Sequence, residues 1–533
     1  MGAIIKRKNL LKKRKLSNLR AHSHLFLIFF LLLVQFVFYL FLCLKILPYT
    51  KFMLVGNEIL SVIFVCFIVN SNGKNEFKLA WMLPVVAFPI FGISMYFLTK
   101  HNTGWTRIRR KLAKTKKITN EHTRRVLKEK LAKEETPAGA ENISDLEAYT
   151  LSTEFFPAFT KNRTKYYPSA EAAFPFMLEE LKKAQKFIFL DYFIIDVSQM
   201  WDRIFEILKE KARNGVKIRV LFDSIGSINI ASKSFCRFLE EHGIEAREFM
   251  PMIPVFNTGL NDRDHHKIMD IDGRICFTGG ANLTDEYINL AHPRFNYWKD
   301  SVISVEGSSV ISFTKLFLQI WHTQEKKVLS RKVGADAKKY LVPCEETFDS
   351  AGTVIPYGDD GYNGEELAEN VYRYILGRAK KYVHIITPYL ILDNKFLSDL
   401  IFAAKRRVDI EILFPAHYDH FLTYCVGLRF VKMLIKNGIK VYFYEPGFIH
   451  SKNFVSDGDI GTVGSINLDY RSLYHHFECG ILLYKSESLK DIEADFEKTK
   501  AQCTLVTPKI FKERVTPARM ILGWVCRIFA PLM

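Results

Sequence analysis

The chain carries one pattern twice, HHKIMDID at residues 265–272 and HSKNFVSD at residues 450–457. Both stretches place histidine, lysine and aspartate in the frame H-x-K-x4-D. Each continues in frame into a glycine and an asparagine, Gly279 with Asn282 and Gly464 with Asn467. One such motif should arise by chance at about one position in ten thousand, so a single copy carries little weight. Two copies with matching extensions indicate an internal repeat.

Each motif is predicted to be a strand that enters a hairpin. A short apolar run follows each lysine, and Asp-Gly pairs at 272–273 and 457–458 close the two runs, which is typical of a tight turn. Residues two apart on a strand face the same way, so each motif puts its histidine and its lysine on one face.

An imidazole beside an ammonium group suits a phosphate ester. The lysine neutralises a non-bridging oxygen, and the imidazole can attack phosphorus or protonate a leaving oxygen. Two half-sites that face each other therefore supply both a nucleophile and an acid. Asp272 and Asp457 stand at the turns, where we expect them to tie the hairpins together rather than touch substrate.

The segments around both motifs alternate between strand and helix patterns. Before the first motif, strands are predicted at 187–190 and 216–222 with a helix at 201–212; before the second, strands at 383–386 and 410–414 with a helix at 396–405. This alternation predicts an α/β protein of two similar halves, each a mixed β-sheet flanked by helices.

At this point the residues resemble a known family. Two H-x-K-x4-D motifs, each followed by Gly and Asn, resemble the phospholipase D superfamily, whose two halves share one site. Further stretches look like bacterial cardiolipin synthases: NDRDHHK at 261–267, GGANLTDEY at 279–287, YWKD at 297–300 and GSINLDYRS at 464–472. A mild departure is Arg407, which stands where the first repeat has Gly215.

The resemblance implies a transfer of a phosphatidyl group from one phosphatidylglycerol to another through a phosphohistidine, without metal or other cofactor. The catalytic set would be both motifs, with His265 as nucleophile and His450 as acid: His265, Lys267, Asp272, His450, Lys452 and Asp457. Asn282, Ser465 and Asn467 would donate hydrogen bonds to the phosphate, and Asp300 and Glu478 resemble the carboxylates that orient the imidazoles. The alternative is a phospholipase D that hydrolyses phospholipids to phosphatidic acid; a nuclease or an inactive membrane scaffold fits less well.

The net charge of +18 could suggest a nucleic-acid partner, but its distribution argues otherwise. Residues 1–22 carry eight basic residues and no acidic one, and residues 100–130 carry twelve basic and two acidic residues, which together account for the whole excess. Basic residues beside apolar segments favour the cytoplasmic side of a membrane and attract anionic lipid. The alternative is a solvated charge run.

Three apolar stretches are candidates for spanning a bilayer: Leu25–Leu44, Phe52–Val69 and Leu79–Leu98. The first and third qualify by length and lack of charge, whereas Asn57 and Glu58 weaken the second. We therefore expect a multi-pass membrane protein with two or three spans, and the resemblance implies that the membrane is the bacterial plasma membrane. The basic flanks do not settle its topology, and nothing in the sequence sets the oligomeric state.

Five regions are predicted: a membrane region at 1–105, a charged linker or amphipathic connector at 106–150, the two repeats at 151–335 and 336–515, and a C-terminal amphipathic segment at 516–533. The C-terminal segment has apolar residues at helical spacing, so it either lies in a membrane interface or packs on the preceding repeat. The nine cysteines form no C-x-x-C pair, which argues against a zinc site. His266, His475 and His476 are interpreted as structural.

Overall fold

The computed structural model describes residues 30, 33–40, 50–72, 74–100, 103–131, 143–230, 232–251, 262–291, 295–362 and 364–532. The chain divides into two compact units. The N-terminal unit ends at Arg107 and also takes in the residues from Ile528 on. The repeat unit comprises Ile108–Pro251 and Asp262–Arg527. Both repeats lie in this second unit.

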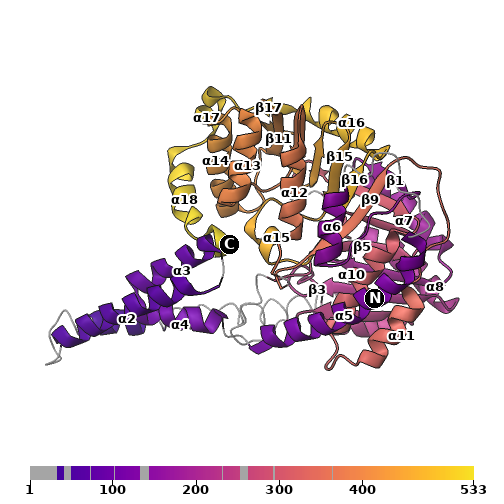
Figure 1. The fold of residues 1–533 in the computed structure, drawn as a ribbon, viewed down its shortest axis with the longest axis horizontal. Helices are drawn as coiled ribbons and strands as arrows, with labels where there is room; N and C mark the ends of the chain where they lie inside the picture. Colours follow the sequence, from indigo (N-terminus) through magenta and orange to yellow (C-terminus); the bar gives the residue numbers. More distant parts are fainter. Residues whose placement is uncertain are drawn as a thin grey trace. The chain divides into compact units, whose positions relative to one another are not determined.

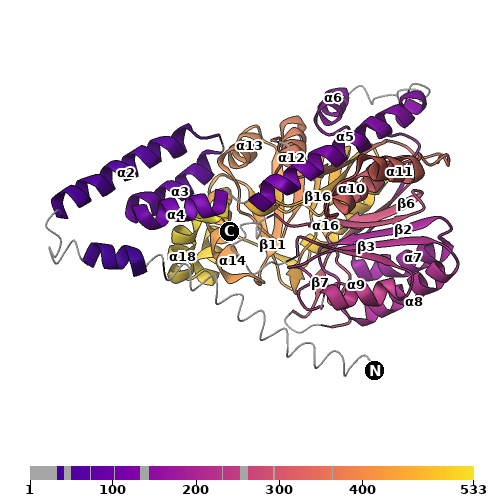
Figure 2. The ribbon, with the colours of Figure 1, turned by 90° about the horizontal axis from the view of Figure 1, so that it is seen from below.

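The first repeat is built on a seven-stranded sheet. Its strands stand in the order β1 (Arg163–Tyr167), β8 (Val302–Glu306), β6 (Ile275–Gly279), β5 (Lys267–Ile271), β2 (Phe187–Tyr192), β3 (Lys217–Asp223) and β4 (Glu245–Phe249). β2, β3 and β4 are parallel, and the other neighbours pair antiparallel. Figure 2 shows α7 (Ala170–Lys183), α8 (Gln199–Arg213) and α9 (Ser232–Glu240) on one face, and α10 (Val310–Thr323) and α11 (Ser330–Tyr340) on the other.

The second repeat has an eight-stranded sheet with the same central arrangement. Its order is β17 (Cys503–Leu505), β12 (Lys440–Tyr444), β11 (Asp409–Pro415), β10 (Tyr382–Ile386), β14 (Asn453–Ser456), β15 (Ile460–Gly464), β16 (Glu478–Tyr484) and β9 (Thr353–Asp359). β10, β11 and β12 are parallel. The helices are α12 (Leu367–Arg378), α13 (Asn394–Lys405), α14 (Phe421–Lys436), α15 (Tyr470–Tyr474) and α16 (Ser488–Lys500). The prediction of two mixed sheets flanked by helices is confirmed.

The predicted hairpins are also confirmed. β5 turns into β6 at Asp272-Gly273, and β14 turns into β15 at Asp457-Gly458. All four turn residues have positive φ, between 54° and 71°, as a tight turn compatible with the strand twist requires.

One buried helix of each repeat also contacts the sheet of the other. Every residue of α10 is buried, and α10 packs on β5 and β2 of its own sheet and on β9 of the second. α16 packs on β10 and β14 and, in the same way, on β1 of the first sheet. The two repeats therefore share a core, so the ends of their central strands are held in one place.

Several helices surround the repeats. α5 (Thr103–Leu131) runs beside α10 and α11 (Figure 1), and α6 (Ser144–Thr153) follows it. α5 is fixed by polar contacts: the amide of Gln319 donates to Thr119 Oγ1 at 2.9 Å, and Lys111 donates to the carbonyl of Thr323 at 3.0 Å. The segment predicted as a linker or connector is therefore helical over much of its length. After the second repeat, toward the C-terminus, the chain forms α17 (Pro508–Arg514) and α18 (Pro517–Arg527).

The N-terminal unit contains α2 (Thr50–Asn70), α3 (Asn75–Ala87), α4 (Pro89–Lys100) and the short η2 (Ala530–Leu532). The expectation of a span at Leu79–Leu98 is not confirmed. This stretch is two helices, because Pro89 has no N–H to donate and disfavours helical backbone at Phe88. Among the described residues one helix, Lys51–Asn70, is long and apolar enough to cross a membrane. It is the stretch that the sequence favoured least.

Most of the first candidate span, Leu25–Leu44, lies outside the described residues, but Gln35 can be placed. It is the polar residue within that stretch, and it is buried. Its side-chain oxygen accepts a hydrogen bond from the backbone N–H of Phe91 at 3.2 Å. That N–H lies in the first turn of α4, where no helix carbonyl is available to it.

Candidate active site

Each histidine motif is held by backbone from the other repeat. The N–H of His265 donates to the carbonyl of Phe477 at 2.9 Å, and the N–H of Phe477 donates back to Arg263 at 2.8 Å. The N–H of His450 donates to the carbonyl of Lys299 at 2.7 Å, where β13 (Phe448–Ile449) pairs with β7 (Trp298–Lys299). These two exchanges bring both motifs to the interface between the repeats.

The orienting carboxylates cross the interface in the same way. Nδ1 of His265 lies 2.9 Å from both oxygens of Glu478, in the second repeat. Nδ1 of His450 lies 2.6 Å from Oδ2 of Asp300, in the first repeat. A carboxylate at Nδ1 favours the proton on that nitrogen and leaves Nε2 as the basic one. Each repeat therefore supplies one imidazole and the carboxylate that orients the other.

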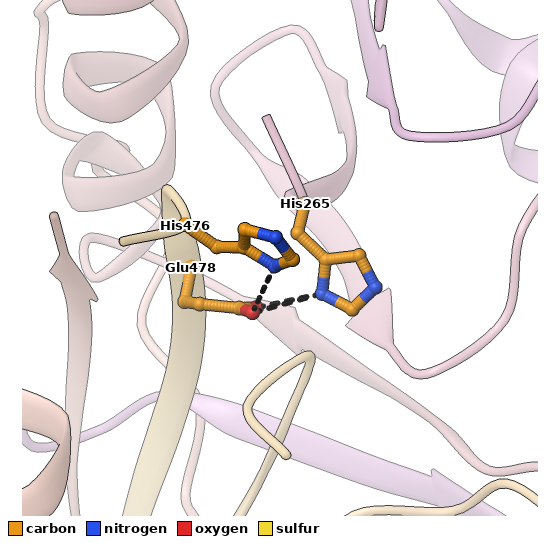
Figure 3. A group of neighbouring side chains, drawn as sticks. All are labelled: His265, His476 and Glu478. Atoms are coloured by element: carbon orange, nitrogen blue, oxygen red, sulfur yellow. Dashed lines mark hydrogen bonds and ion pairs between the residues drawn. The ribbon is translucent and has the colours of Figure 1, made fainter. Parts of the chain in front are cut away.

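Glu478 has further partners that hold it in place. The hydroxyls of Ser465 and Ser472 donate to its two oxygens, and Nε2 of His266 lies 3.1 Å from its backbone carbonyl. Figure 3 shows its carboxylate between the imidazoles of His265 and His476, whose Nδ1 is 3.5 Å from Oε1. Glu478 is completely buried, so these contacts satisfy a carboxylate that water does not reach.

Both motif lysines are buried, and their charge is only partly compensated. Nζ of Lys267 donates to the carbonyl of His265 at 2.7 Å, and Nζ of Lys452 donates to that of His450. Burial lowers the pKa of Lys267 to about 8 and that of Lys452 to about 7, although Glu478 and Asp300 oppose the shift. Two carboxylates, Glu478 and Asp300, oppose the charges of both buried lysines. A bound anion such as a phosphodiester would stabilise the ammonium forms further.

Both imidazoles are neutral in the free site. Burial, followed by the charges of Lys267 and Lys452, lowers the pKa of His265 well below its usual value. Burial and Lys452 lower the pKa of His450 to about 4, against the opposing pull of Asp300. A neutral imidazole with a free Nε2 is the nucleophilic and basic form. A bound anion would raise both pKa values, because it stabilises the imidazolium form.

The three residues predicted to donate hydrogen bonds to phosphate differ in the partners that they already have. Asn282 accepts from the N–H of Ile194 at 3.1 Å and donates to the Tyr287 hydroxyl at 2.8 Å, which leaves one amide proton. Asn467 is buried, and its side-chain oxygen has no hydrogen-bond partner among the described residues. Ser465 was expected to donate to phosphate. In this structure its hydroxyl faces the carboxylate of Glu478 and the carbonyl of Cys479, 3.2 Å away, so its donation to phosphate stays a prediction.

Asp272 and Asp457 lie in the hairpins, as their position at the turns predicted, and not with the catalytic groups that the resemblance implied. Asp272 accepts from the backbone N–H groups of residues 185, 186 and 187 at 2.7–2.8 Å. Asp457 accepts from those of residues 380, 381 and 382 at 2.7–2.9 Å. Each aspartate thus fixes the start of the neighbouring strand, β2 or β10.

Sequence reasoning gave no role to Ser472, and its interpretation of His266 as structural agrees with the contacts of that ring. The ring nitrogens of His266 face acceptors on both sides, the carbonyl of Glu478 and the carboxylate of Asp264, 2.9 Å away. Burial is the largest single effect on His266 and lowers its pKa. The carboxylates of Asp264 and Asp191 together outweigh it, so the pKa of His266 is raised. Ser472 was present in the quoted stretch 464–472, but only its contact with Glu478 reveals its function.

Two groups near the motifs have side chains that could hold a metal ion: His265, His476 and Glu478, and Asp191, Asp264 and His266. In the first group the carboxylate is already hydrogen-bonded to His265 and to two serine hydroxyls. In the second, the imidazole is hydrogen-bonded to backbone and faces both carboxylates. The lysines also place positive charge close to the first group. The arrangement thus suits an anion at the histidines better than a cation.

Comparison with known proteins agrees with this geometry. Residues 177–321 and 372–500 match the family described as cardiolipin synthase, PLD-like domain, and residues 59–100 match the phospholipase D-nuclease N-terminal family. An uncharacterized protein of Streptococcus mutans is 37% identical over 88% of this chain and 99% of its own length. A cardiolipin synthase of Alkalihalophilus pseudofirmus is 30% identical over 89% of this chain and 92% of its own length.

A solved structure is similar in fold. The crystal structure of phosphatidylserine synthase from Haemophilus influenzae has a TM-score of 0.54 at 13% identity, over 71% of this chain and 95% of that one. At that identity the likeness concerns the fold alone. From its family match and its relatives, this chain belongs to the cardiolipin synthase family of phospholipase D-like proteins.

Proposed function

We propose that this protein is a phosphatidyltransferase that makes cardiolipin and glycerol from two molecules of phosphatidylglycerol. The observation that carries the proposal is the crossed pair of histidines. Each imidazole is buried and held at Nδ1 by a carboxylate of the other repeat, with a buried lysine two residues away. This arrangement offers two Nε2 atoms to one phosphodiester.

The first half-reaction forms a phosphohistidine. Nε2 of His265 attacks phosphorus, and the bond between phosphorus and the glycerol oxygen breaks. His450, as imidazolium, gives its proton to the departing oxygen, and Lys267 and Lys452 stabilise the charge that grows on the non-bridging oxygens. The free site holds both imidazoles neutral, so the anionic substrate itself favours the proton on His450. The product of this step is a phosphatidyl-enzyme and free glycerol.

The second half-reaction reverses these roles. A hydroxyl of the second phosphatidylglycerol gives its proton to His450 and attacks phosphorus, and the bond to His265 breaks. Cardiolipin leaves, and both histidines return to their starting forms. One phosphodiester is exchanged for another, so the reaction needs no nucleotide. The near symmetry of the motifs leaves the reverse order, with His450 as nucleophile, as the alternative to test.

The membrane placement is also part of the proposal. α2 presents an apolar surface that is mostly exposed, as expected of a helix that faces lipid. We propose a multi-pass protein of the bacterial plasma membrane, in which residues 1–105 form the membrane region and residues 151–335 and 336–515 the two repeats. The anionic lipid phosphatidylglycerol would be both the substrate and a component of the surrounding bilayer.

The decisive experiment follows the label of the head group. The full chain, reconstituted in vesicles of phosphatidylglycerol labelled in the terminal glycerol, should release labelled glycerol and form cardiolipin in equal amounts. His265→Ala and His450→Ala should each abolish both products, because the two groups act as one unit. His242→Ala is the matched control, because this histidine follows α9 and its ring contacts Phe205 and Phe238. Phosphatidic acid as the main product would support the phospholipase reading instead.

Chelation provides a separate check. Lys267 and Lys452 supply the positive charge at the phosphate, so EDTA should leave the rate of the chemical step unchanged. Loss of activity in EDTA that one particular metal restores would contradict this mechanism.

A further inference from the structure

One face of α18 is fixed to the second repeat. Gly523 lies directly against α14, where an added Cβ would overlap the backbone carbonyl of Cys425. Four residues further on, the guanidinium of Arg527 lies 5.1 Å from the ring of Phe430 and contacts the sulfur of Met433. The helix therefore has a defined rotation about its own axis, because only the glycine face can approach α14 this closely.

The opposite face of α18 is apolar and exposed. Ile521, Trp524 and Val525 are 64%, 60% and 42% exposed. Their spacing of three and four residues places them in a single stripe along the helix. Single exposed apolar residues are ordinary, but a stripe on a helix whose other face is packed marks an interaction surface.

The charges around this stripe favour an anionic lipid surface over a protein partner of mixed charge. Residues 508–533 contain five basic residues and one acidic residue. Of the basic residues, Arg514 pairs with Glu445 and Arg527 lies on the face that packs on α14. Lys509 and Lys512 of α17 are exposed. Basic residues beside an apolar stripe with a tryptophan are the pattern of a helix that lies in the membrane interface, where the indole ring prefers the head-group level.

The chain beyond α18 agrees with this reading. Three residues after Arg527 it enters η2, which packs on the apolar helix α3 within the N-terminal unit. Ile528 and Phe529, between the two helices, are also exposed.

We propose that Ile521, Trp524 and Val525 insert into the interface of an anionic bilayer and dock the second repeat on the membrane. This contact is additional to any membrane span and does not depend on turnover. The two alternatives for the C-terminal segment are then both correct, one for each face: the Gly523 face packs on the repeat, and the Trp524 face binds lipid.

The test uses the full chain in vesicles and reads Trp524 directly. The difference in fluorescence between the protein and its Trp524→Phe variant isolates this indole from the other tryptophans. In vesicles of phosphatidylglycerol brominated near the head group, the Trp524 signal should be strongly quenched. The matched control is Phe402→Trp in the Trp524→Phe background, because Phe402 of α13 is 62% exposed on the same repeat. Its indole should remain unquenched by lipid and accessible to iodide.

Two outcomes would overturn the proposal. If Trp524 is accessible to iodide and not quenched by brominated lipid, the stripe faces water. If Trp524 is shielded from iodide in vesicles and is still not quenched by brominated lipid, another protein segment or a second copy covers it. Neither readout involves catalysis, so failure here leaves the proposed reaction untouched.

A double variant tests the proposal by the reaction rate on two forms of the substrate. Ile521→Asp with Val525→Asp should lower the rate on phosphatidylglycerol in vesicles by at least about tenfold, since each change removes roughly the transfer free energy of a buried aliphatic side chain. The rate on short-chain phosphatidylglycerol dispersed in detergent should stay the same. An equal loss on both substrates would mean that the helix supports the fold and does not dock on lipid.

Discussion

Each carboxylate orients a different histidine, so neutralising Glu478 and neutralising Asp300 should affect different steps of the reaction. Glu478→Gln keeps the shape of the side chain but removes its charge. The wild-type carboxylate is fully buried and accepts from Nδ1 of His265 and from the hydroxyls of Ser465 and Ser472. In the variant an amide proton can face Nδ1, which favours the tautomer with its proton on Nε2 and blocks attack. Asp300→Asn should do the same to His450.

The size of the loss follows from the contacts. A charge-assisted hydrogen bond in a buried site contributes roughly 1.5–3 kcal/mol, and the wrong tautomer adds to this. We expect kcat to fall by about 10²–10⁴-fold for each variant, or roughly 3–5.5 kcal/mol in activation free energy. The fold should survive, since the volume of the side chain is conserved.

Two substrates distinguish the roles. Phosphatidylglycerol needs a proton on its leaving oxygen, whereas a phosphatidyl ester of 4-nitrophenol does not. If His265 is the nucleophile, Asp300→Asn should recover most of the first-turnover burst of nitrophenol, and Glu478→Gln should not. Recovery of Glu478→Gln alone would reverse the order of the two histidines. More than half of wild-type activity in Glu478→Gln on phosphatidylglycerol would refute the orienting role of that carboxylate.

Three further predictions concern stability and pH. Asp272→Ala should lower the free energy of unfolding by roughly 1–3 kcal/mol, because three backbone N–H groups lose their acceptor; the melting temperature should drop while kcat per folded molecule stays near wild type. Arg407→Gly should raise the melting temperature, since Arg407 has φ 69° in the place where the first repeat has Gly215 with φ 84°, and this conformation costs a non-glycine residue about 1–2 kcal/mol; an unchanged or lower value would show that its side chain contributes more than the strain costs. The value of kcat/KM should fall as pH rises through about 7 to 8, because burial lowers the pKa values of Lys452 and Lys267 to that range and the free site then loses positive charge; a flat profile up to pH 9 would contradict it.

The hairpins and the alternation of strands and helices could be predicted from sequence because they depend on local chemistry. An apolar run closed by Asp-Gly specifies its own turn, and the structure has positive φ at both residues of each turn. Arg407 shares the left-handed backbone conformation of Gly215 although its residue type disfavours it, so local chemistry alone does not explain this match.

The pairing of each histidine with its carboxylate could not be derived in that way. His265 and Glu478 are 213 residues apart in the chain, and nothing in the spacing shows that they meet. The resemblance to a family suggested that Glu478 and Asp300 orient imidazoles, but it did not say which carboxylate serves which histidine. The split of the third apolar stretch at Pro89 was visible in sequence, yet hydropathy outweighed it in the prediction.

The crossing of the pairs links catalysis to the interface between repeats. The contacts that join the repeats, such as His265 to Phe477 and His450 to Lys299, are made by the backbone of the two motif histidines themselves. A single repeat would hold an imidazole without its carboxylate, so its Nδ1 proton would not be fixed and neither step could begin. The assembled interface, in contrast, creates both oriented imidazoles at once. The two half-reactions need a nucleophile and an acid at the same moment, and shared core helices such as α10 and α16 keep these groups at a fixed separation.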